Sequence, residues 1–170
     1  MAESDRTRER ERPPIAENPY EIVMQTKAAR TERNRTGPVV IKPSDHETYL
    51  ARQGRLMFYL NPHVYKDTPL QQWQVFKHEI RTHSGKHRHQ GGLIIYVLDG
   101  KGYSIIDEVR VDWKRGDLLL LPIKPEGVVH QHFNTQPGTP AHWVAFYSIP
   151  MLAYLADTMV QLEVSPEYKG

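Results

Sequence analysis

Between residues 39 and 148 the chain is a succession of short apolar runs that are rich in β-branched and aromatic residues. Turn-forming dipeptides such as Asn61-Pro62 and Asp99-Gly100 separate these runs, and each run has the length of a strand. No helical pattern interrupts the series, and this spacing is typical of closed or two-sheet β-architectures. We therefore expect an all-β sandwich or barrel, with strands over residues 39–41, 56–60, 73–82, 93–98, 103–106, 118–121, 128–133 and 142–148.

The N-terminal part of the chain has a different character. Residues 1–17 alternate Arg and Glu, which leaves little to bury and predicts a disordered or loosely docked arm. Asn18-Pro19 is a helix-start signal, so a short helix to about Arg30 is expected before Gly37-Pro38 breaks it. We treat residues 1–36 as a charged arm with a short helix.

The pattern changes again after Pro150, beyond the β-domain expected over residues 37–150. Apolar residues there recur at intervals of three and four, which predicts an amphipathic helix within a C-terminal segment over residues 151–170. The residues of this predicted apolar stripe are Met151, Leu152, Leu155, Met159 and Leu162.

Composition limits the chemistry that is available to the chain. The 170 residues include no cysteine, which excludes disulfides, thiolate metal sites and thiol nucleophiles. With 22 Lys and Arg against 20 Asp and Glu, the net charge of +2 predicts no nucleic-acid partner. Every apolar stretch is too short to cross a membrane, and the N-terminus is charged from its third residue. We expect a cytoplasmic protein with no membrane or nucleic-acid partner.

Two of the histidine pairs in the chain have the same spacing, His87-Arg88-His89 and His130-Gln131-His132. On a strand, residues i and i+2 lie on one face about 6.6 Å apart, so both imidazoles of a pair can reach one ion. On a helix the same spacing would send them to nearly opposite sides. A single pair would be ordinary surface composition, but two pairs in a cysteine-free β-protein predict a metal site.

The sequence around these pairs resembles the cupin superfamily. The first cupin motif places Glu and then Gly after His-x-His, and here His87 and His89 are followed by Leu93 and Gly100. The second motif is matched by Gly116-Asp117, Leu118–Leu121, Pro122, Gly127, His130 and Asn134. The resemblance implies a double-stranded β-helix (a jelly-roll barrel), metal ligands His87, His89 and His130, and a homodimer joined through the N-terminal segment or the C-terminal helix. Because Pro122 and Gly127 are more widely spaced than usual, His132 remains an alternative ligand to His130.

Leu93 stands where many cupins carry a coordinating Glu, so the expected metal has three neutral ligands and an open side. This resembles the three-His cupin dioxygenases of the gentisate and salicylate type. The resemblance implies Fe(II), dioxygen and a small hydroxylated aromatic or enolic substrate that is oxidatively cleaved. A zinc-dependent isomerase, hydrolase or lyase and a non-enzymatic metal- or ligand-binding protein remain as alternatives, as do Mn, Ni and Cu as the ion.

Strand alternation supplies the other candidate site residues. The less charged face of residues 73–82 is the expected interior, which makes Gln74 and His78 candidates for substrate binding. Arg81 is the nearest cation for a substrate carboxylate, although its parity places it outside. His132 is expected inward, beside the ion, as a catalytic proton-transfer group with a pKa near neutrality, or else as a hydrogen-bond partner inside the barrel.

Two further expectations concern the walls of the barrel. Leu93, Ile95 and Val97 share one face and are expected to form an apolar cavity floor. Trp143 and Tyr147 are assigned to core packing rather than to the rim of the site.

Overall fold

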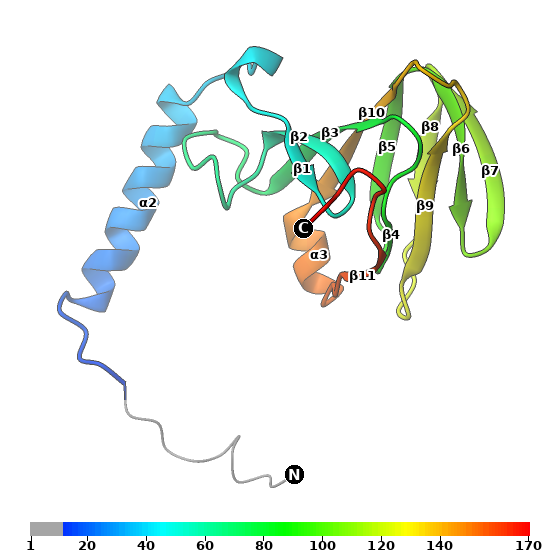
Figure 1. Cartoon of the computed structure of the whole chain (residues 1–170). Coiled ribbons are helices and arrows are strands. Elements are labelled where there is room, and N and C mark those ends of the chain that lie inside the picture. The colour runs from blue at the N-terminus through cyan, green and yellow to red at the C-terminus, as the bar shows by residue number, and fades with distance from the viewer. Residues whose placement is uncertain (1–11) are drawn as a thin grey trace, which may run out of the picture.

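The computed structural model describes residues 12–170, so most of the predicted disordered arm lies outside the described residues. Two helices and a set of short strands follow one another along this part of the chain (Figure 1). The helices are α2 (Pro19–Thr36) and α3 (Ile149–Tyr154), and a 3₁₀ turn covers Pro43–Asp45. The strands are β1 (Tyr49–Ala51), β2 (Gly54–Leu60), β3 (Trp73–Ile80), β4 (Lys86–His89), β5 (Leu93–Asp99), β6 (Lys101–Ile106), β7 (Val109–Lys114), β8 (Leu118–Leu121), β9 (Val128–Asn134), β10 (Ala141–Ser148) and β11 (Val160–Glu163).

Antiparallel pairing arranges these strands in two sheets. Within residues 12–170 the six-stranded sheet has the order β1-β2-β3-β10-β5-β8, and the five-stranded sheet has the order β11-β4-β9-β6-β7. The crossed strand order carries the chain back and forth between the two sheets, as in a jelly roll. The predicted all-β jelly-roll barrel is therefore confirmed.

The predicted strands match the observed ones closely except at the start. The apolar run Val39–Ile41 forms no strand; Val39 and Val40 are 95% and 72% exposed in an irregular connection that directly follows α2. The apolar pattern also missed β1, β4 and β7. β4 (Lys86–His89) was indicated only by its histidine spacing, and β7 mixes apolar residues with charged ones. β7 nevertheless pairs with β6 through a two-residue turn, Asp107-Glu108, whose positive φ values of 48° and 70° suit a tight hairpin.

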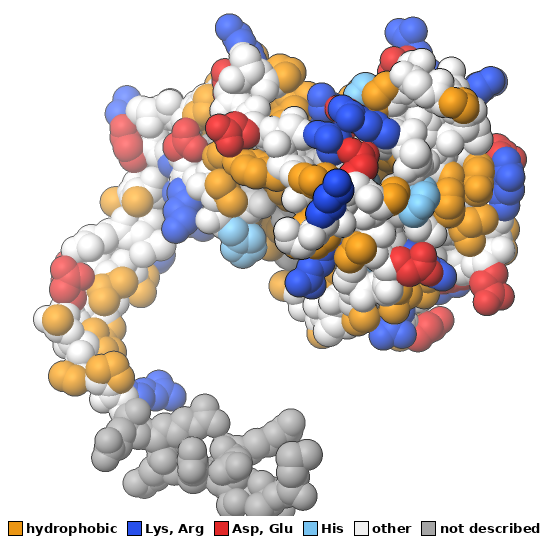
Figure 2. Space-filling view, in the orientation of Figure 1, with side chains coloured by type: hydrophobic (Ala, Val, Ile, Leu, Met, Phe, Trp, Pro, Cys, Tyr) orange, Lys and Arg blue, Asp and Glu red, His pale blue; other side chains and the backbone are white. Residues whose placement is uncertain are grey.

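Helix α2 begins as predicted but continues further. The Asn18 side chain accepts a hydrogen bond from the Tyr20 amide at 3.0 Å, and the helix runs to Thr36, six residues beyond the expected end. None of its residues is buried, and hydrophobic side chains lie open along the projecting helix (Figure 2). Glu32, Arg33 and Arg35 favour a helix, and no Gly or Pro interrupts the segment before Gly37-Pro38, which accounts for the extra length.

The predicted C-terminal helix is mostly wrong. Only α3 is helical; Ala156 then takes a left-handed conformation with φ 49°, and the chain pairs with β4 as β11. Asp157 fixes this change of direction, because its Oδ1 accepts a hydrogen bond from the Gln90 amide at 2.9 Å. Pairing with the exposed edge of β4 therefore overrides the helical periodicity and brings Asp157 to the end of β4.

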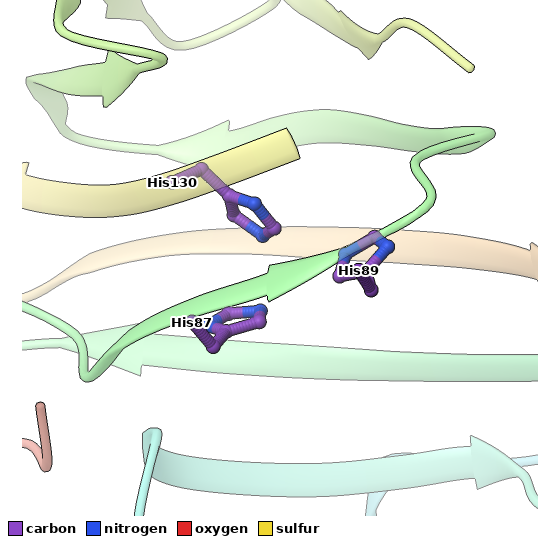
Figure 3. Close-up of side chains that lie close together, drawn as sticks. All are labelled: His87, His89 and His130. Carbon is purple, nitrogen blue, oxygen red and sulfur yellow. The ribbon is translucent and has the colours of Figure 1, made fainter. Parts of the chain in front are cut away.

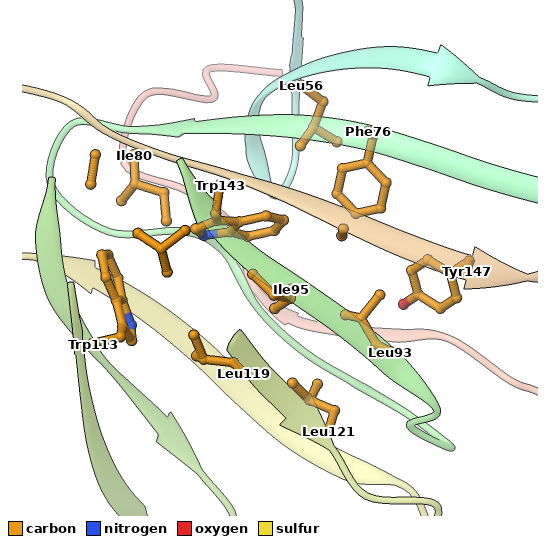
Figure 4. Close-up of a cluster of buried hydrophobic side chains, with 13 residues drawn as sticks. Leu56, Phe76, Ile80, Leu93, Ile95, Trp113, Leu119, Leu121, Trp143 and Tyr147 are labelled. Atoms are coloured by element: carbon orange, nitrogen blue, oxygen red, sulfur yellow. The ribbon is translucent and has the colours of Figure 1, made fainter. Parts of the chain in front are cut away.

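The inner faces of the two sheets differ in polarity. The six-stranded sheet contributes most of the hydrophobic core (Figure 4). Leu93, Ile95 and Val97, expected to form a cavity floor, are at most 3% exposed and belong to this core instead. The five-stranded sheet places buried polar side chains inward from β4, β9 and β6: His87, His89, His130, His132 and Ser104. The polar interior of this sheet holds the candidate site.

In the described part of the chain, neither helix combines the length and the apolar character needed to cross a lipid bilayer.

Candidate metal centre

Three histidines from two neighbouring strands meet inside the barrel (Figure 3). The short strand β4 turns His87 and His89 to the same inner face, and its register with β9 places His130 directly across from His87. One ring nitrogen from each of the three lies within 4.8 Å of the others, and each residue is at most 6% exposed. The three predicted ligand residues are therefore brought together.

Backbone carbonyls orient two of these rings. Nδ1 of His87 lies 3.4 Å from the Gly85 carbonyl oxygen, and Nδ1 of His130 lies 3.2 Å from that of Val128. Because a carbonyl oxygen only accepts, each Nδ1 carries the proton and each Nε2 keeps a free lone pair. The His130 Nε2 is buried with no hydrogen-bond partner in the described structure. Buried lone pairs that converge without donors fit a divalent cation.

The electrostatics of the cluster favour the form that binds a metal. Burial, together with the charge that a neighbouring imidazole would carry, lowers the pKa of His87 to about 4. Burial also lowers the pKa values of His89 and His130. All three rings are consequently neutral at pH 7, as metal ligation requires. Among residues 12–170 no carboxylate joins the group, and Leu93 is packed in the hydrophobic core.

His132 shares the inner face of β9 but does not belong to the three-histidine group. Its Nδ1 lies 2.7 Å from the hydroxyl of Ser104, and that hydroxyl also accepts a hydrogen bond from Trp113 Nε1 at 2.9 Å. Burial lowers the pKa of His132 well below its ordinary value, so the predicted near-neutral pKa is wrong. The geometry matches the expected alternative, a hydrogen-bond partner within the barrel, and it places His130 rather than His132 in the cluster.

A cavity of about 610 Å³ lies next to the cluster. Apolar side chains from β2, β3 and β10 line one side of it, and polar side chains from the β1–β2 turn and the C-terminal segment line the other. Tyr147 connects the cavity to the cluster, because its hydroxyl lies 2.8 Å from His89 Nε2. The lining residues include Gln53, Leu56, Phe58, Gln74, Phe76, Leu152, Met159 and Gln161.

The predicted substrate-binding residues occupy three different environments. Gln74 lines the cavity. His78 faces the interior but is buried edge-on against Trp143, with ring centroids 4.7 Å apart, and neither ring nitrogen has a partner among the described residues. Burial lowers the pKa of His78 to about 3. Arg81 lies outside the barrel, as its parity predicts, and donates to Glu79 at 2.7 Å.

Sequence reasoning missed three residues at this cavity. Arg52 reaches it from the β1–β2 turn, in a segment where no strand pair was expected. Asp157 reaches it because the chain leaves the helical path after α3. Tyr147 lines the cavity as well as packing in the core. Alternation along β10 predicts that Tyr147 points inward, but it does not distinguish the core from a cavity.

Comparison with known protein families identifies one domain in the chain. Residues 75–147 match the cupin domain family model. No curated protein sequence matches the chain.

Solved structures share the fold at low sequence identity. Pac13 from Streptomyces, described as a nucleoside dehydratase, superposes with a TM-score of 0.53 at 12% identity in a variant with uridine, covering 76% of this chain and 95% of that one. A variant of salicylate 1,2-dioxygenase from Pseudoaminobacter salicylatoxidans in complex with gentisate superposes with a TM-score of 0.54 at 19% identity. That alignment covers 87% of this chain but only 39% of the dioxygenase chain.

The matched domain, the crossed two-sheet topology and the three inward histidines agree with one another. The chain therefore carries a cupin domain over residues 75–147, on a fold of the cupin type.

Proposed function

We propose that this cupin is a mononuclear non-haem Fe(II) dioxygenase that cleaves a small hydroxylated aromatic or enolic substrate, with His87, His89 and His130 as the metal ligands. The observation that carries the proposal is the buried three-histidine cluster, which no carboxylate of residues 12–170 joins and which Tyr147 connects to a partly aromatic cavity. Three neutral ligands leave coordination positions for a bidentate substrate and for dioxygen. When bound, ferrous iron would supply the electron transfer that activates dioxygen.

The cavity suits a small planar substrate. Phe58, Phe76 and Tyr147 offer aromatic surface, while Gln74 and Arg52 offer hydrogen-bond donors at the edge. Within residues 12–170 the Arg52 guanidinium makes no ion pair, so it replaces Arg81 as the cation available to an acidic group. We assign Gln74 and Arg52 to orienting the substrate and the apolar walls to excluding water.

Two further buried histidines, His78 and His132, contact Trp143 near the cluster. Each lies edge-on against Trp143, with ring centroids 4.7 and 5.1 Å from it. We propose that neutral His78 hydrogen-bonds a substrate that enters deeply, because both of its nitrogens lack partners among the described residues. His132, held by Ser104, instead keeps β9 and β6 in register beside the ligands.

A zinc-dependent lyase or hydrolase is the second candidate function. The observation that favours it is Asp157, a carboxylate that lines the cavity and lies 4.0 Å from His89. A carboxylate there can act as a general acid or base on a substrate, which lyase chemistry requires and ring-cleaving oxygenation does not. The shared fold with a nucleoside dehydratase is compatible with this alternative.

Oxygen uptake after controlled metal loading distinguishes the candidates. The metal-free protein is loaded anaerobically with one equivalent of Fe(II) or Zn(II) and is then assayed against hydroxybenzoates, catechols and enolic acids. Substrate-dependent oxygen consumption with iron only, abolished in His87→Ala but retained in Arg81→Ala, supports the dioxygenase. Turnover with zinc and no oxygen consumption supports the lyase or hydrolase. Tight metal binding with no turnover contradicts both and leaves a binding protein.

We further propose that the protein is a homodimer in which α2 contributes to the contact. This helix has no buried residue and leaves Tyr20, Val23 and Met24 between 44% and 66% exposed. An isolated helix of this length gains little stability without packing. Light scattering should give twice the chain mass for the full chain, and a chain lacking residues 1–36 should give the monomer mass.

A further inference from the structure

His89 differs from the other two histidines of the cluster in what its ring nitrogens contact. The amide of Gly91 donates to His89 Nδ1 at 3.1 Å, whereas the Nδ1 atoms of His87 and His130 face carbonyl oxygens. An amide only donates, so Nδ1 of His89 is the bare nitrogen and Nε2 carries the proton. His89 is therefore in the opposite tautomer to its two neighbours.

The protonated Nε2 of His89 has a partner of its own. The Tyr147 hydroxyl lies 2.8 Å away and accepts its hydrogen bond, and the two rings are 5.4 Å apart at their centroids. Tyr147 is 8% exposed and belongs to both the hydrophobic core and the cavity wall. The contact holds His89 in a form that cannot donate an Nε2 lone pair to an ion.

A carboxylate stands on the other side of the same ring. Asp157 Oδ1 lies 4.0 Å from His89 Nδ1 and is only partly exposed. It is fixed in place by the Gln90 amide, and the Thr158 amide next to it donates to the Gln90 side chain at 2.8 Å. A small rotation of the ring would bring Nδ1 within hydrogen-bond distance of this oxygen. Histidines that ligate metals usually donate their other ring N–H to such a group.

We propose that Tyr147 and Asp157 form a two-position switch on His89 that couples metal uptake to release of the Tyr147 hydroxyl toward the cavity. With the site empty, Nε2–H of His89 donates to Tyr147. On loading, one proton leaves Nε2 and one arrives at Nδ1, so the imidazole stays neutral. The hydrogen bond from the Gly91 amide to Nδ1 breaks as the ring rotates, Nδ1–H donates to Asp157, and Nε2 serves as a ligand. The Tyr147 hydroxyl is thereby released toward the cavity, where it can hydrogen-bond an oxygen of a bound molecule. The inference rests on the proposed metal site but not on the oxygenase reaction.

The tautomers can be read directly in the metal-free protein. Nitrogen-15 NMR of the full chain, labelled at histidine, distinguishes a protonated from a bare ring nitrogen. We expect Nδ1–H for His87 and His130 and Nε2–H for His89, with His89 changing to Nδ1–H when Zn(II) is added. A His89 resonance of the Nδ1–H form before metal addition would overturn the switch.

Metal affinity supplies a second test in which the two variants move in opposite directions. Tyr147→Phe removes the hydrogen bond that competes with the ion, so Zn(II) affinity, measured against a chromogenic chelator, should rise about 2- to 10-fold. Asp157→Asn removes the anionic acceptor and should lower the affinity about 10- to 100-fold. The matched surface controls Tyr96→Phe and Asp112→Asn should leave it unchanged.

The outcomes separate the switch from the metal site. If the wild-type chain takes up no divalent ion, the proposed function fails, and the switch fails with it. If the wild-type chain binds Zn(II) but Tyr147→Phe and Asp157→Asn leave the affinity unchanged or shift it in the same direction, only the switch is overturned.

Discussion

The two histidine pairs have the same spacing and the same inward orientation, yet their surroundings give them different roles. On β4, both His87 and His89 belong to the three-histidine cluster. On β9, only His130 does, because His87 stands across from it, whereas Ser104 stands across from His132. The hydroxyl of Ser104 satisfies His132, while the His130 Nε2 has no partner in residues 12–170. The residue across from each histidine on the neighbouring strand therefore decides its role: His130 is a candidate ligand, and His132 is a structural histidine.

The largest expected difference between the two histidines of β9 is in metal binding. His130→Ala removes one of three ligands and should weaken Zn(II) or Fe(II) binding more than about 100-fold, since ligands contribute most of the affinity of such a site. His132→Ala leaves all three ligands in place and should change the affinity less than about 10-fold. Isothermal titration of both variants measures this contrast, and equal losses would contradict the distinction drawn here.

The stability of the metal-free protein should depend more on His132 than on His130, the reverse of the order expected for metal affinity. Ser104→Ala leaves both Trp113 Nε1 and His132 Nδ1 buried without their partner, which should cost about 2–4 kcal/mol. His130→Leu removes one nitrogen that lacks a partner and one long hydrogen bond to the Val128 carbonyl, and it leaves no second side chain unsatisfied, so its cost should be smaller than that of the matched change His132→Leu. Urea unfolding in the presence of a chelator compares these variants. A larger loss for His130→Leu would show that the two roles are assigned the wrong way round.

Acid should destabilise the metal-free protein through the same buried rings. Burial lowers the pKa of His78 to about 3 and that of His87 to about 4, against an ordinary value of 6.5 in the unfolded chain. Below pH 6.5 the unfolded chain therefore binds more protons than the folded one. Stability should be full above about pH 6.5 and fall as the pH drops toward 4. Urea midpoints between pH 4 and 8 test this, and His78→Leu should reduce the slope; a midpoint independent of pH would contradict the buried neutral state.

Sequence pattern was sufficient to predict which way side chains point along a single strand. Alternation along β3 and β5 correctly placed Gln74 and His78 inward and Arg81 outward, and the His-x-His spacing correctly implied strands. Pattern alone could not show which inward histidines would meet, because that depends on the register between β4 and β9.

The C-terminal segment shows a different limit of sequence reasoning. Its apolar spacing fits a helix, but residues 160–163 pair with β4, and local periodicity carries no information about an unpaired strand edge. The position of Asp157 beside His89 follows from that pairing and was missed for the same reason.

The smallest expected effects are those of the two arginines considered for an anionic substrate. Arg81→Ala removes an exposed pair with Glu79 and should leave the urea midpoint and ligand binding unchanged. Arg52→Ala should be equally mild for stability but should weaken binding of an aromatic acid to the metal-loaded protein about 5- to 10-fold. Calorimetric titration with a hydroxybenzoate separates them, and a loss confined to Arg81→Ala would contradict the position of the cavity.

X-ray absorption spectroscopy of the metal-loaded protein tests the central claim, that three imidazoles from β4 and β9 hold one ion, most directly. We expect one tightly bound divalent ion per chain, with scattering from three imidazole rings whose nitrogen ligands lie at about 2.1 Å. In His87→Ala, one imidazole contribution should be lost. Failure to bind an ion, or a first shell with fewer than three imidazoles in the wild-type protein, would contradict it.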